Sequence, residues 1–230
     1  MRPTSDFSDA LRDSLPLLVA LVPFGAVYGA FAVSSGLSVT QTLGFSLIVY
    51  AGASQFLALQ LIGVGSPLWA VLVAVFAINA RHILYSASVG RHLQRFSGPA
   101  KAAAFFLLVD PSFAAAEARA ARGSLGKTYY FTFALALYVG WALASLAGAV
   151  FGGLIDDPRR YGLDFAIPVY FLAQTMAFRA RDGFWIVAGV SALVAILAAA
   201  TLGPPWHVTL GGLAGVAVAA LRAGRRGAAA

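Results

Sequence analysis

The sequence has no cysteine and few charged residues. Without cysteine the chain can form no disulfide, no thiolate metal site and no cysteine nucleophile. Charged residues make up 11% of the chain, whereas about 25% is usual for a soluble domain. The stretch from Ser14 to Ala80 contains no Asp, Glu, Lys or Arg. This excludes the core of a water-soluble domain, because about 20 consecutive apolar residues already cross a bilayer.

Apolar sequence fills the chain instead, and 60% of its residues are hydrophobic. In hydrocarbon the backbone must satisfy its own hydrogen bonds, which helices do within one segment. The apolar runs do not alternate as the strands of a membrane β-barrel would. We therefore predict an all-α, polytopic integral membrane helix bundle with seven or eight hydrophobic segments, some of which could be broken or re-entrant.

The apolar runs define one transmembrane domain, residues 14–221, between a polar N-terminal lead, 1–13, and a basic C-terminal tail, 222–230. A weak similarity at an offset of 120 residues raises the possibility of a repeat between 15–118 and 128–221. The first run follows acidic rather than basic residues, so we expect a retained span and not a cleaved signal peptide. The predicted spans are Ser14–Val33, Leu43–Gly63, Pro67–Arg81 or further, Ala102–Ala118, Tyr129–Ile155, Phe165–Phe178, Gly183–Leu202 and Val208–Leu221.

The charge pattern predicts part of the topology. The formal net charge is +7, and the basic residues lie mainly in short segments between spans and in the tail. The segments 119–127 and 179–182 and the tail are all expected on the cytoplasmic side. If the first four spans all cross and the N-terminus is inside, the basic segment 91–101 falls outside. Either Leu43–Gly63 or Ala102–Ala118 is then re-entrant, or this segment is an exception.

Pairs of glycines four residues apart occur in three of the spans. They are Gly25 with Gly29, Gly148 with Gly152, and Gly211 with Gly215. Small residues at this spacing let two membrane helices approach closely, so we expect these faces to be helix–helix contacts.

A polar, glycine-containing stretch interrupts the second span at residues 51–55. Gly52, Ser54 and Gln55 lie there among small residues. A helix break at membrane depth lines a cavity, where the freed backbone groups can bind a ligand. Alternatively, the small residues allow close packing while Ser54 and Gln55 form hydrogen bonds across a helix interface. The sequence leaves both readings open.

The end of the third span carries Asn79, Arg81 and His82, followed by Tyr85. Asn79 and His82 share one helix face, and Arg81 and Tyr85 share another. An arginine inside a span usually faces a water-filled path and could hold a carboxylate. Arg81 could equally lie at the interface and extend its charged end toward water.

Asp110 is the only acid near the middle of an apolar run. It could pair with an ammonium group, carry a proton or neutralise Arg81. Asp-Pro is also common in turns, so the span around Asp110 could consist of two half-helices. We expect Glu117 to be a solvated charge at the end of this span. The histidines at 82, 92 and 207 are too dispersed for a metal motif, and no enzyme signature is present.

Two motifs give the chain a family resemblance. Tyr-Ala-Gly-Ala-Ser-Gln-Phe (50–56) and Asn-Ala-Arg-His-Ile-Leu-Tyr (79–85) resemble the AzlC family, the large subunit of branched-chain amino-acid exporters. Pro-Phe-Gly (23–25) and Asp-Phe-Ala-Ile-Pro (164–168) agree with it as weaker matches. The resemblance implies a permease of the inner membrane that exports leucine, isoleucine or valine with a small hydrophobic AzlD-type partner. Where the family tends to have Glu after the aspartate, this chain has Pro111, which leaves Asp110 as a single acid.

The leading hypothesis is therefore a transporter without a cofactor or metal. In it, the dipoles of a broken helix and Arg81 meet the carboxylate of a zwitterion, and Asp110 meets its ammonium group or a proton. Two alternatives are a membrane-embedded enzyme that uses His82 as a base and a scaffold subunit that does not transport. The candidate substrate-binding residues are Gly52, Ser54, Gln55, Asn79, Arg81, His82 and Asp110.

Overall fold

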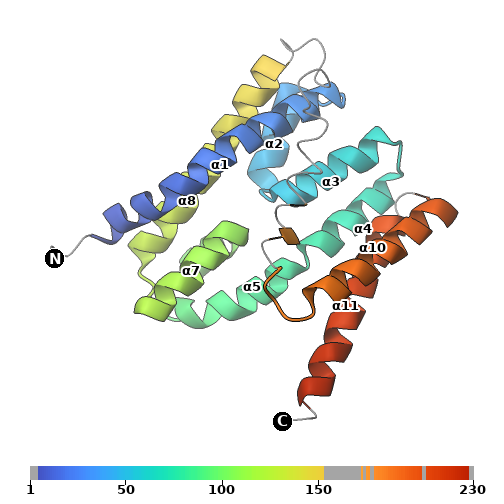
Figure 1. The fold of residues 1–230 in the computed structure, drawn as a ribbon. Helices are drawn as coiled ribbons and strands as arrows, with labels where there is room; N and C mark the ends of the chain where they lie inside the picture. Colours follow the sequence, from blue (N-terminus) through green and yellow to red (C-terminus); the bar gives the residue numbers. More distant parts are fainter. Residues whose placement is uncertain (1–4, 153–171, 173–174, 177–178, 204–205, 228–230) are drawn as a thin grey trace. The chain divides into compact units, whose positions relative to one another are not determined.

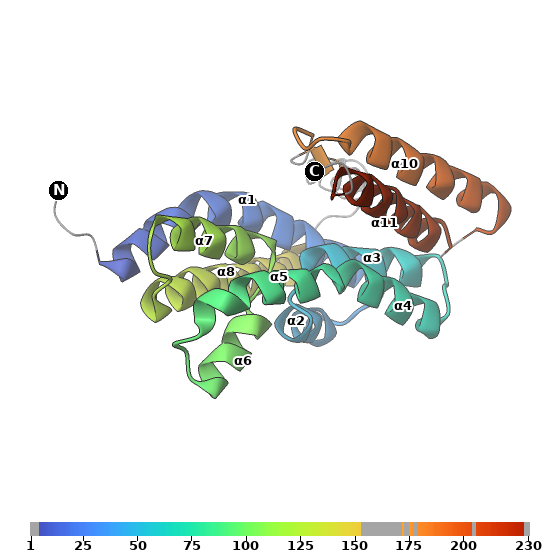
Figure 2. The same ribbon diagram turned by 90° about the horizontal axis from the view of Figure 1, so that it is seen from below.

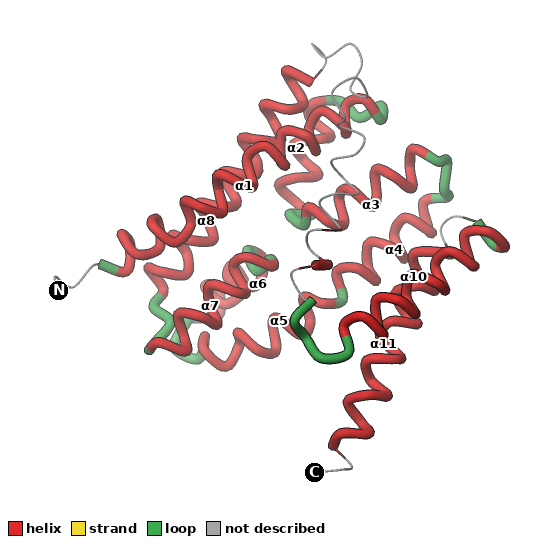
Figure 3. The backbone as a smooth tube through the Cα atoms, in the orientation of Figure 1, coloured by secondary structure: helices red, strands yellow, loops and turns green. Residues whose placement is uncertain are grey.

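The computed structural model describes residues 5–152, 172, 175–176, 179–203 and 206–227. These residues form helices joined by short loops, without a strand among them (Figure 3). They divide into two compact units. One consists of Met1–Gln55 and Ile78–Asp156, and the other of Phe56–Ala77 and Asp157–Ala230.

The first unit contains most of the helices (Figure 1). Two further helices, α3 (Gly52–Gly63) and α4 (Leu68–Asn79), pass from one unit into the other. The second unit contains α10 (Phe184–Thr201) and α11 (Trp206–Gly227). The helices that lie entirely within the first unit are α1 (Asp6–Ser34), α2 (Val39–Ile48), α5 (Arg81–Gly90), the 3-10 turn η1 (Arg91–Leu93), α6 (Gly98–Phe106), α7 (Asp110–Arg122) and α8 (Lys127–Phe151).

The all-helical prediction is confirmed for the described residues, but the number of segments is not. Among these residues, 4 helices are long and apolar enough to cross a membrane: Asp6–Ser34, Leu68–Leu93, Lys127–Phe151 and Phe184–Thr201. The predicted spans Leu43–Gly63 and Ala102–Ala118 are each divided into two short helices. Most of the predicted span Phe165–Phe178 lies outside the described residues. The count of seven or eight segments therefore stays a prediction.

Helix α1 begins within the acidic lead, eight residues before the predicted start of its span. Ser5 caps it, with its hydroxyl accepting a hydrogen bond from the Ser8 backbone N–H. Asp6 and Asp9 lie in the first turn, where carboxylates interact favourably with the helix dipole. The acidic residues that argue against a signal peptide thus stabilise the start of a long helix.

Helices α1 and α8 pack side by side through their glycines (Figure 1). A Cβ atom placed on Gly25 would lie 2.7 Å from the Ala144 Cβ, and one on Gly152 would lie 2.6 Å from the Cα of Ala30. The contacts advance in the same direction along both helices, so α1 and α8 run parallel. The predicted role of these small residues in close packing is confirmed.

Helices α10 and α11 use the third glycine pair in the same way. A Cβ on Gly211 would lie 2.8 Å from the Cβ of Ala195, and the Ser191 hydroxyl donates a 2.7 Å hydrogen bond to the Gly211 carbonyl. A Cβ on Gly215 would lie 3.3 Å from Ser191. At the other end of the pair, Arg222 lies 3.9 Å from Asp182. These two helices are therefore antiparallel.

Helix α7 lies beside α5 and runs in the same direction. Near the start of both helices Arg81 contacts Asp110, at 2.9 Å. Further along, Arg91, directly after α5, contacts Glu117 of α7 at 3.0 Å. Since α6 leads from the end of α5 back to the level of the start of α7, α6 and α7 run in opposite directions. In Figure 2 they lie on different sides of α5.

The basic loops before α6 and after α7 lie at one end of the first unit. Lys127, at the start of α8, lies over the ring of Phe96, 5.6 Å from its centroid. Arg119, near the end of α7, forms ion pairs with Asp6 and Asp9 at the start of α1. The start of α1, the Phe96 loop and the α7–α8 connection therefore share this end, which we call the charged end.

The α1–α8 contact predicts a sharp difference between two glycines. A Cβ at Gly148 would lie 2.6 Å from the carbonyl carbon of Ala26, whereas one at Gly44 would meet nothing within 4 Å. Gly148→Ala should destabilise the protein by about 1–3 kcal/mol through overpacking. Gly44→Ala should leave stability unchanged or raise it by up to about 1 kcal/mol. Thermal unfolding of the two purified variants in one detergent measures this, and equal stability would contradict the described packing.

Candidate functional site

An ion pair joins α5 and α7 in the first unit. Arg81 Nη2 lies 2.9 Å from Asp110 Oδ2, and the Tyr85 hydroxyl donates a 2.7 Å hydrogen bond to Asp110 Oδ1. The Tyr85 ring in turn stacks on Phe113, with ring centroids 4.3 Å apart. The side chains of the pair are 31% and 29% exposed. The carboxylate thus has a partner on each oxygen and is not fully enclosed.

Arg81 lies near the middle of a long apolar helix. The helical segment Leu68–Leu93 has 26 residues, with a single turn residue, Ala80, between α4 and α5. A span that ended at Arg81 would have put this residue at the interface, but the helix continues well past it. The sequence left several roles open for Asp110, and the structure shows one of them: Asp110 neutralises Arg81.

Asp110 is the first residue of α7, directly after a break in the chain. The break is closed by Ser112, whose hydroxyl accepts from the Val109 backbone N–H at 2.7 Å and donates to the Leu107 carbonyl at 2.9 Å. Pro111 suits the first turn of a helix, and the helix dipole favours a carboxylate there. The single span expected at Ala102–Ala118 was therefore wrong, and the alternative of two half-helices is confirmed.

Three buried polar atoms near this pair have no hydrogen-bond partner in the described part of the chain: Asn79 Oδ1, Arg81 Nε and His82 Nε2. The His82 ring meets Tyr85 edge-on, with centroids 5.7 Å apart. Buried polar atoms are normally paired, so donors and acceptors are left over around the ion pair. We call Asn79, Arg81, His82, Tyr85 and Asp110 the ion-pair group.

The second span is broken between α2 and α3, as predicted. Helix α2 ends at Ile48 and α3 begins at Gly52 (Figure 3). Tyr50, between them, has φ of 40°, a left-handed conformation that is uncommon for residues other than glycine. The prediction of an interrupted span is therefore confirmed. The break itself lies at residues 49–51, slightly before the predicted 51–55.

The first turn of α3 carries the three predicted residues of this stretch. Gly52 packs on the indole of Trp141, since a Cβ there would lie 3.1 Å from Trp141 Cη2. The Ser54 hydroxyl donates to the Ala51 carbonyl at 2.8 Å, and so it bonds within its own turn rather than across an interface. Gln55 is fully buried. The backbone N–H groups of such a first turn have no partner within the helix.

Gln55 belongs to a buried polar network between helices. Its Nε2 donates to the Ser46 hydroxyl of α2 at 3.2 Å, and Ser46 donates to the Ser145 hydroxyl of α8 at 2.9 Å. Gln55 Oε1, Trp141 Nε1 and the Tyr50 hydroxyl have no partner in the described chain. For Gln55, the interface reading of the sequence is thus confirmed, and an acceptor still remains free.

The predicted residues therefore fall into two groups. Arg81 and Asp110 contact each other directly, with Asn79 and His82 beside Arg81 in the sequence. Gly52, Ser54 and Gln55 form a second cluster with Tyr50 and Trp141, which we call the break group. The contacts described above hold each group together and do not join one group to the other.

The candidate list from the sequence left out three members of these groups, Tyr50, Tyr85 and Trp141. It also left out Ser46 and Phe113, which contact the groups, and Ser145, which contacts Ser46. Tyr85 had a signal, because its spacing of four residues places it on the Arg81 face of the helix. Ser46 and Ser145 had none, because each is a lone hydroxyl in apolar sequence and the two are 99 residues apart. Phe113 and Trp141 likewise looked like ordinary apolar residues.

The charged end holds a separate set of ionic contacts. Glu117 accepts from Ser88 at 2.7 Å and from Arg91 at 3.0 Å, so it is not the solvated charge that we expected. The Ser88 hydrogen bond, helped by Arg91, lowers the pKa of Glu117, although burial opposes this. Burial acts to lower the pKa of Arg119, but hydrogen bonds to Asp6 and Asp9 outweigh it and raise that pKa.

No metal site is evident in the described ranges, which contain no group of three or more His, Asp or Glu side chains that could hold an ion. The free atoms of the two groups are hydrogen-bond donors and acceptors, together with one charge of each sign. Such a set suits a small polar or zwitterionic organic solute.

Long apolar helices, an ion pair within an apolar helix bundle and a broken helix define a multi-pass membrane protein of the transporter type. Residues 16–155 match the family described as AzlC protein, and the chain belongs to this family. It is 31% identical to the inner membrane protein YgaZ of Escherichia coli, over 96% of this chain and 90% of that protein. It is 25% identical to the branched-chain amino acid transport protein AzlC of Bacillus subtilis, over 72% of this chain and 65% of that protein.

A membrane protein of Helicobacter pylori is 25% identical over 89% of both chains. No solved structure matches the chain. Family and relatives together assign the protein a role in membrane transport.

Proposed function

We propose that the protein exports branched-chain or similar small amino acids across the inner membrane, together with a small hydrophobic AzlD-type subunit. The Bacillus subtilis relative, named as a branched-chain amino acid transport protein, supports this substrate class. The observation that carries the proposal is the Arg81–Asp110 ion pair with unpaired polar atoms around it.

A bound amino acid can substitute for both side chains of this pair, because it carries one negative and one positive group. Its carboxylate takes the place of Asp110 on Arg81, where Nε is still free to donate. Its ammonium group takes the place of Arg81 on Asp110. Each charge in the protein then keeps an opposite partner throughout, which matters because a lone charge at the bilayer centre costs at least about 2.5–3.5 kcal/mol.

Aromatic rings beside the pair offer an apolar wall. Tyr85 holds Asp110 with its hydroxyl and stacks on Phe113 with its ring. A zwitterion bound between Arg81 and Asp110 would place its side chain next to this ring pair. We assign the preference for apolar amino acids to this neighbourhood.

The break group supplies a second set of contacts for the same solute. The first-turn N–H groups at Gly52 and Ser54 carry partial positive charge and suit a carboxylate. Gln55 Oε1 is a buried free acceptor that suits an ammonium group. This arrangement corresponds to the discontinuous helices with which secondary transporters bind their substrates.

In this proposal, we place the charged end on the cytoplasmic side. The basic segments 91–101 and 119–127 carry its positive charge, and such segments between spans are retained in the cytoplasm. Helices α6 and α7 then enter the membrane from the cytoplasm and return to it. Asp6 and Arg91 both lie at the charged end, and α1 and the helix Leu68–Leu93 each cross once between them, so the segment of α2 and α3 must also return to the side on which it starts. With this arrangement the basic segment 91–101 is cytoplasmic.

The ion pair gives the first functional prediction. Arg81→Ala and Asp110→Asn should each lower leucine export by at least about tenfold, since a hydrogen bond to a charged group contributes about 1.5–3 kcal/mol. Efflux of labelled leucine from vesicles with equal amounts of inserted protein measures this.

Asp182→Asn is the matched control. It removes an acid that is 63% exposed and lies 3.9 Å from Arg222, outside both groups. Its export should equal that of the wild type. Normal export by Arg81→Ala and Asp110→Asn would reject the assignment and would favour a scaffold subunit that does not transport.

The break group gives a second prediction. Gln55→Met keeps the length of the side chain and removes both its donor and its free acceptor, whereas Ser46→Ala removes only the hydroxyl between Gln55 and Ser145. If the free acceptor meets the solute, Gln55→Met should lose about tenfold in export. Ser46→Ala should retain most of it. Equal losses in the two variants would assign Gln55 a structural role alone.

A further inference from the structure

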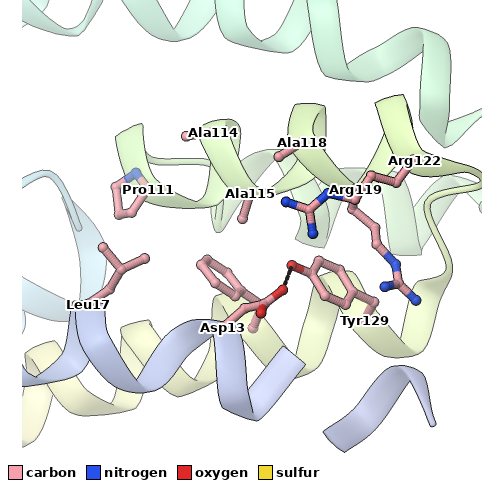
Figure 4. A pocket seen from close by; sticks show the side chains of 10 residues that line it. Asp13, Leu17, Pro111, Ala114, Ala115, Ala118, Arg119, Arg122 and Tyr129 are labelled. Atoms are coloured by element: carbon pink, nitrogen blue, oxygen red, sulfur yellow. Dashed lines mark hydrogen bonds between the residues drawn. The ribbon is translucent and has the colours of Figure 1, made fainter. Parts of the chain in front are cut away.

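A surface hollow of about 200 Å³ lies in the first unit between α7, α1 and α8 (Figure 4). Its α7 wall is made of small side chains, Ala114, Ala115 and Ala118, which leave the space open. Leu17 and Phe133 form the facing apolar walls. A hollow of this size is below the range of about 300–1,000 Å³ for drug-sized ligands and suits a small solute.

The outer part of the hollow carries charges of both signs. Asp13 accepts a 2.7 Å hydrogen bond from the Tyr129 hydroxyl, and the Arg119 guanidinium lies 4.7 Å from the centre of the Tyr129 ring (Figure 4). Arg122 lines the same part. Arg119 and Arg122 also line a neighbouring recess of about 270 Å³ with Asp6, Gly123 and Ser124. The hollow therefore opens toward the charged end.

The inner end of the hollow approaches the ion-pair group. Pro111 lines it there, and Asp110 is the adjacent residue in α7. Residues 111, 114, 115, 118, 119 and 122 recur at helical spacing, so one face of α7 runs from the Asp110 end of the helix to the charged end. Arg119 and Arg122 lie at the outer end of this face, with Asp13 of α1 opposite them, and apolar side chains lie further in.

We propose that this hollow is the loading site for the solute on the cytoplasmic side, from which an apolar amino acid passes along α7 to Arg81 and Asp110. The inference rests on the proposed function. Arg122, which is exposed, attracts the carboxylate of the amino acid, and Asp13 attracts its ammonium group. The alanine face and Leu17 receive the apolar side chain.

The absence of cysteine from the sequence allows a direct test. Ala118→Cys places one thiol in the hollow, and a membrane-impermeant maleimide is applied to inside-out or to right-side-out vesicles. We expect labelling at least about tenfold faster in inside-out vesicles, where the cytoplasmic face is accessible. Saturating leucine should slow the labelling several-fold. Modification should lower leucine export by about tenfold, equivalent to about 1.4 kcal/mol.

Two alanines of the same helix serve as matched controls. Ala116 is 1% exposed and does not line the hollow, so Ala116→Cys should resist labelling from either side. Ala121 is exposed, one turn beyond Ala118, and is not part of the wall. Ala121→Cys should be labelled equally with and without leucine, and its export should remain unchanged after modification.

The outcomes separate the loading site from the proposed function. The loading site alone is overturned if Ala118→Cys exports leucine normally and modification of its thiol does not lower that export. It is also overturned if Ala118→Cys is labelled as slowly as Ala116→Cys. If wild-type vesicles do not export leucine, the proposed substrate is wrong. Other small zwitterions are then tested for their effect on the labelling of Ala118→Cys. If one of them slows the labelling, the loading site is supported, and if none does, the loading site is overturned.

Discussion

The ion pair between Arg81 and Asp110 is the interaction on which the arrangement of α5, α6 and α7 depends. Either charge alone would be costly in apolar surroundings, by at least about 2.5–3.5 kcal/mol at the bilayer centre. Together they fix α7 beside α5, with Tyr85 holding the second oxygen of the carboxylate. Because the partners lie near the start of both helices, α7 must run parallel to α5, and α6 must return the chain to that level.

The glycine contacts provide the rigid frame around these irregular parts. Helices α1 and α8 approach so closely at Gly29 and Gly148 that a methyl group cannot be added at either position without displacing backbone. Beside this frame, α2 and α3 are separated by a break, and so are α6 and α7. Each break is closed partly by a serine, Ser54 in one and Ser112 in the other, whose hydroxyl bonds to a nearby backbone carbonyl. Short helices with free ends are thus held on long helices that pack tightly.

Much of the local structure could be predicted from the sequence, because it depends on neighbouring residues. The break near Gly52, the half-helix beginning at Asp110 and the close packing of Gly25 and Gly148 all follow from composition and spacing. The starts of helices were less predictable, as in α1, where acidic residues of the polar lead extend the helix back to Asp6. There, capping by Ser5 and the helix dipole outweigh the low hydrophobicity.

Contacts between distant residues could not be predicted in this way. Nothing in the sequence near Ser46 indicates that it meets Ser145, or that Glu117 is held by Ser88 and Arg91. The topology was ambiguous for the same reason, since only the pairing of α5 with α7 shows that the two basic loops lie together. The candidate residues were found one by one from their unusual polarity, and their division into two groups required the structure.

The most direct test of the account is a binding competition with leucine and two analogues that each lack one charge. Leucinamide lacks the carboxylate, and isocaproate lacks the ammonium group. If a zwitterion replaces both halves of the Arg81–Asp110 pair, each analogue should displace labelled leucine from the purified protein at least about tenfold more weakly than leucine does. If either analogue competes as well as leucine, one half of the ion pair does not meet the solute, and the solute does not replace both charges of the pair.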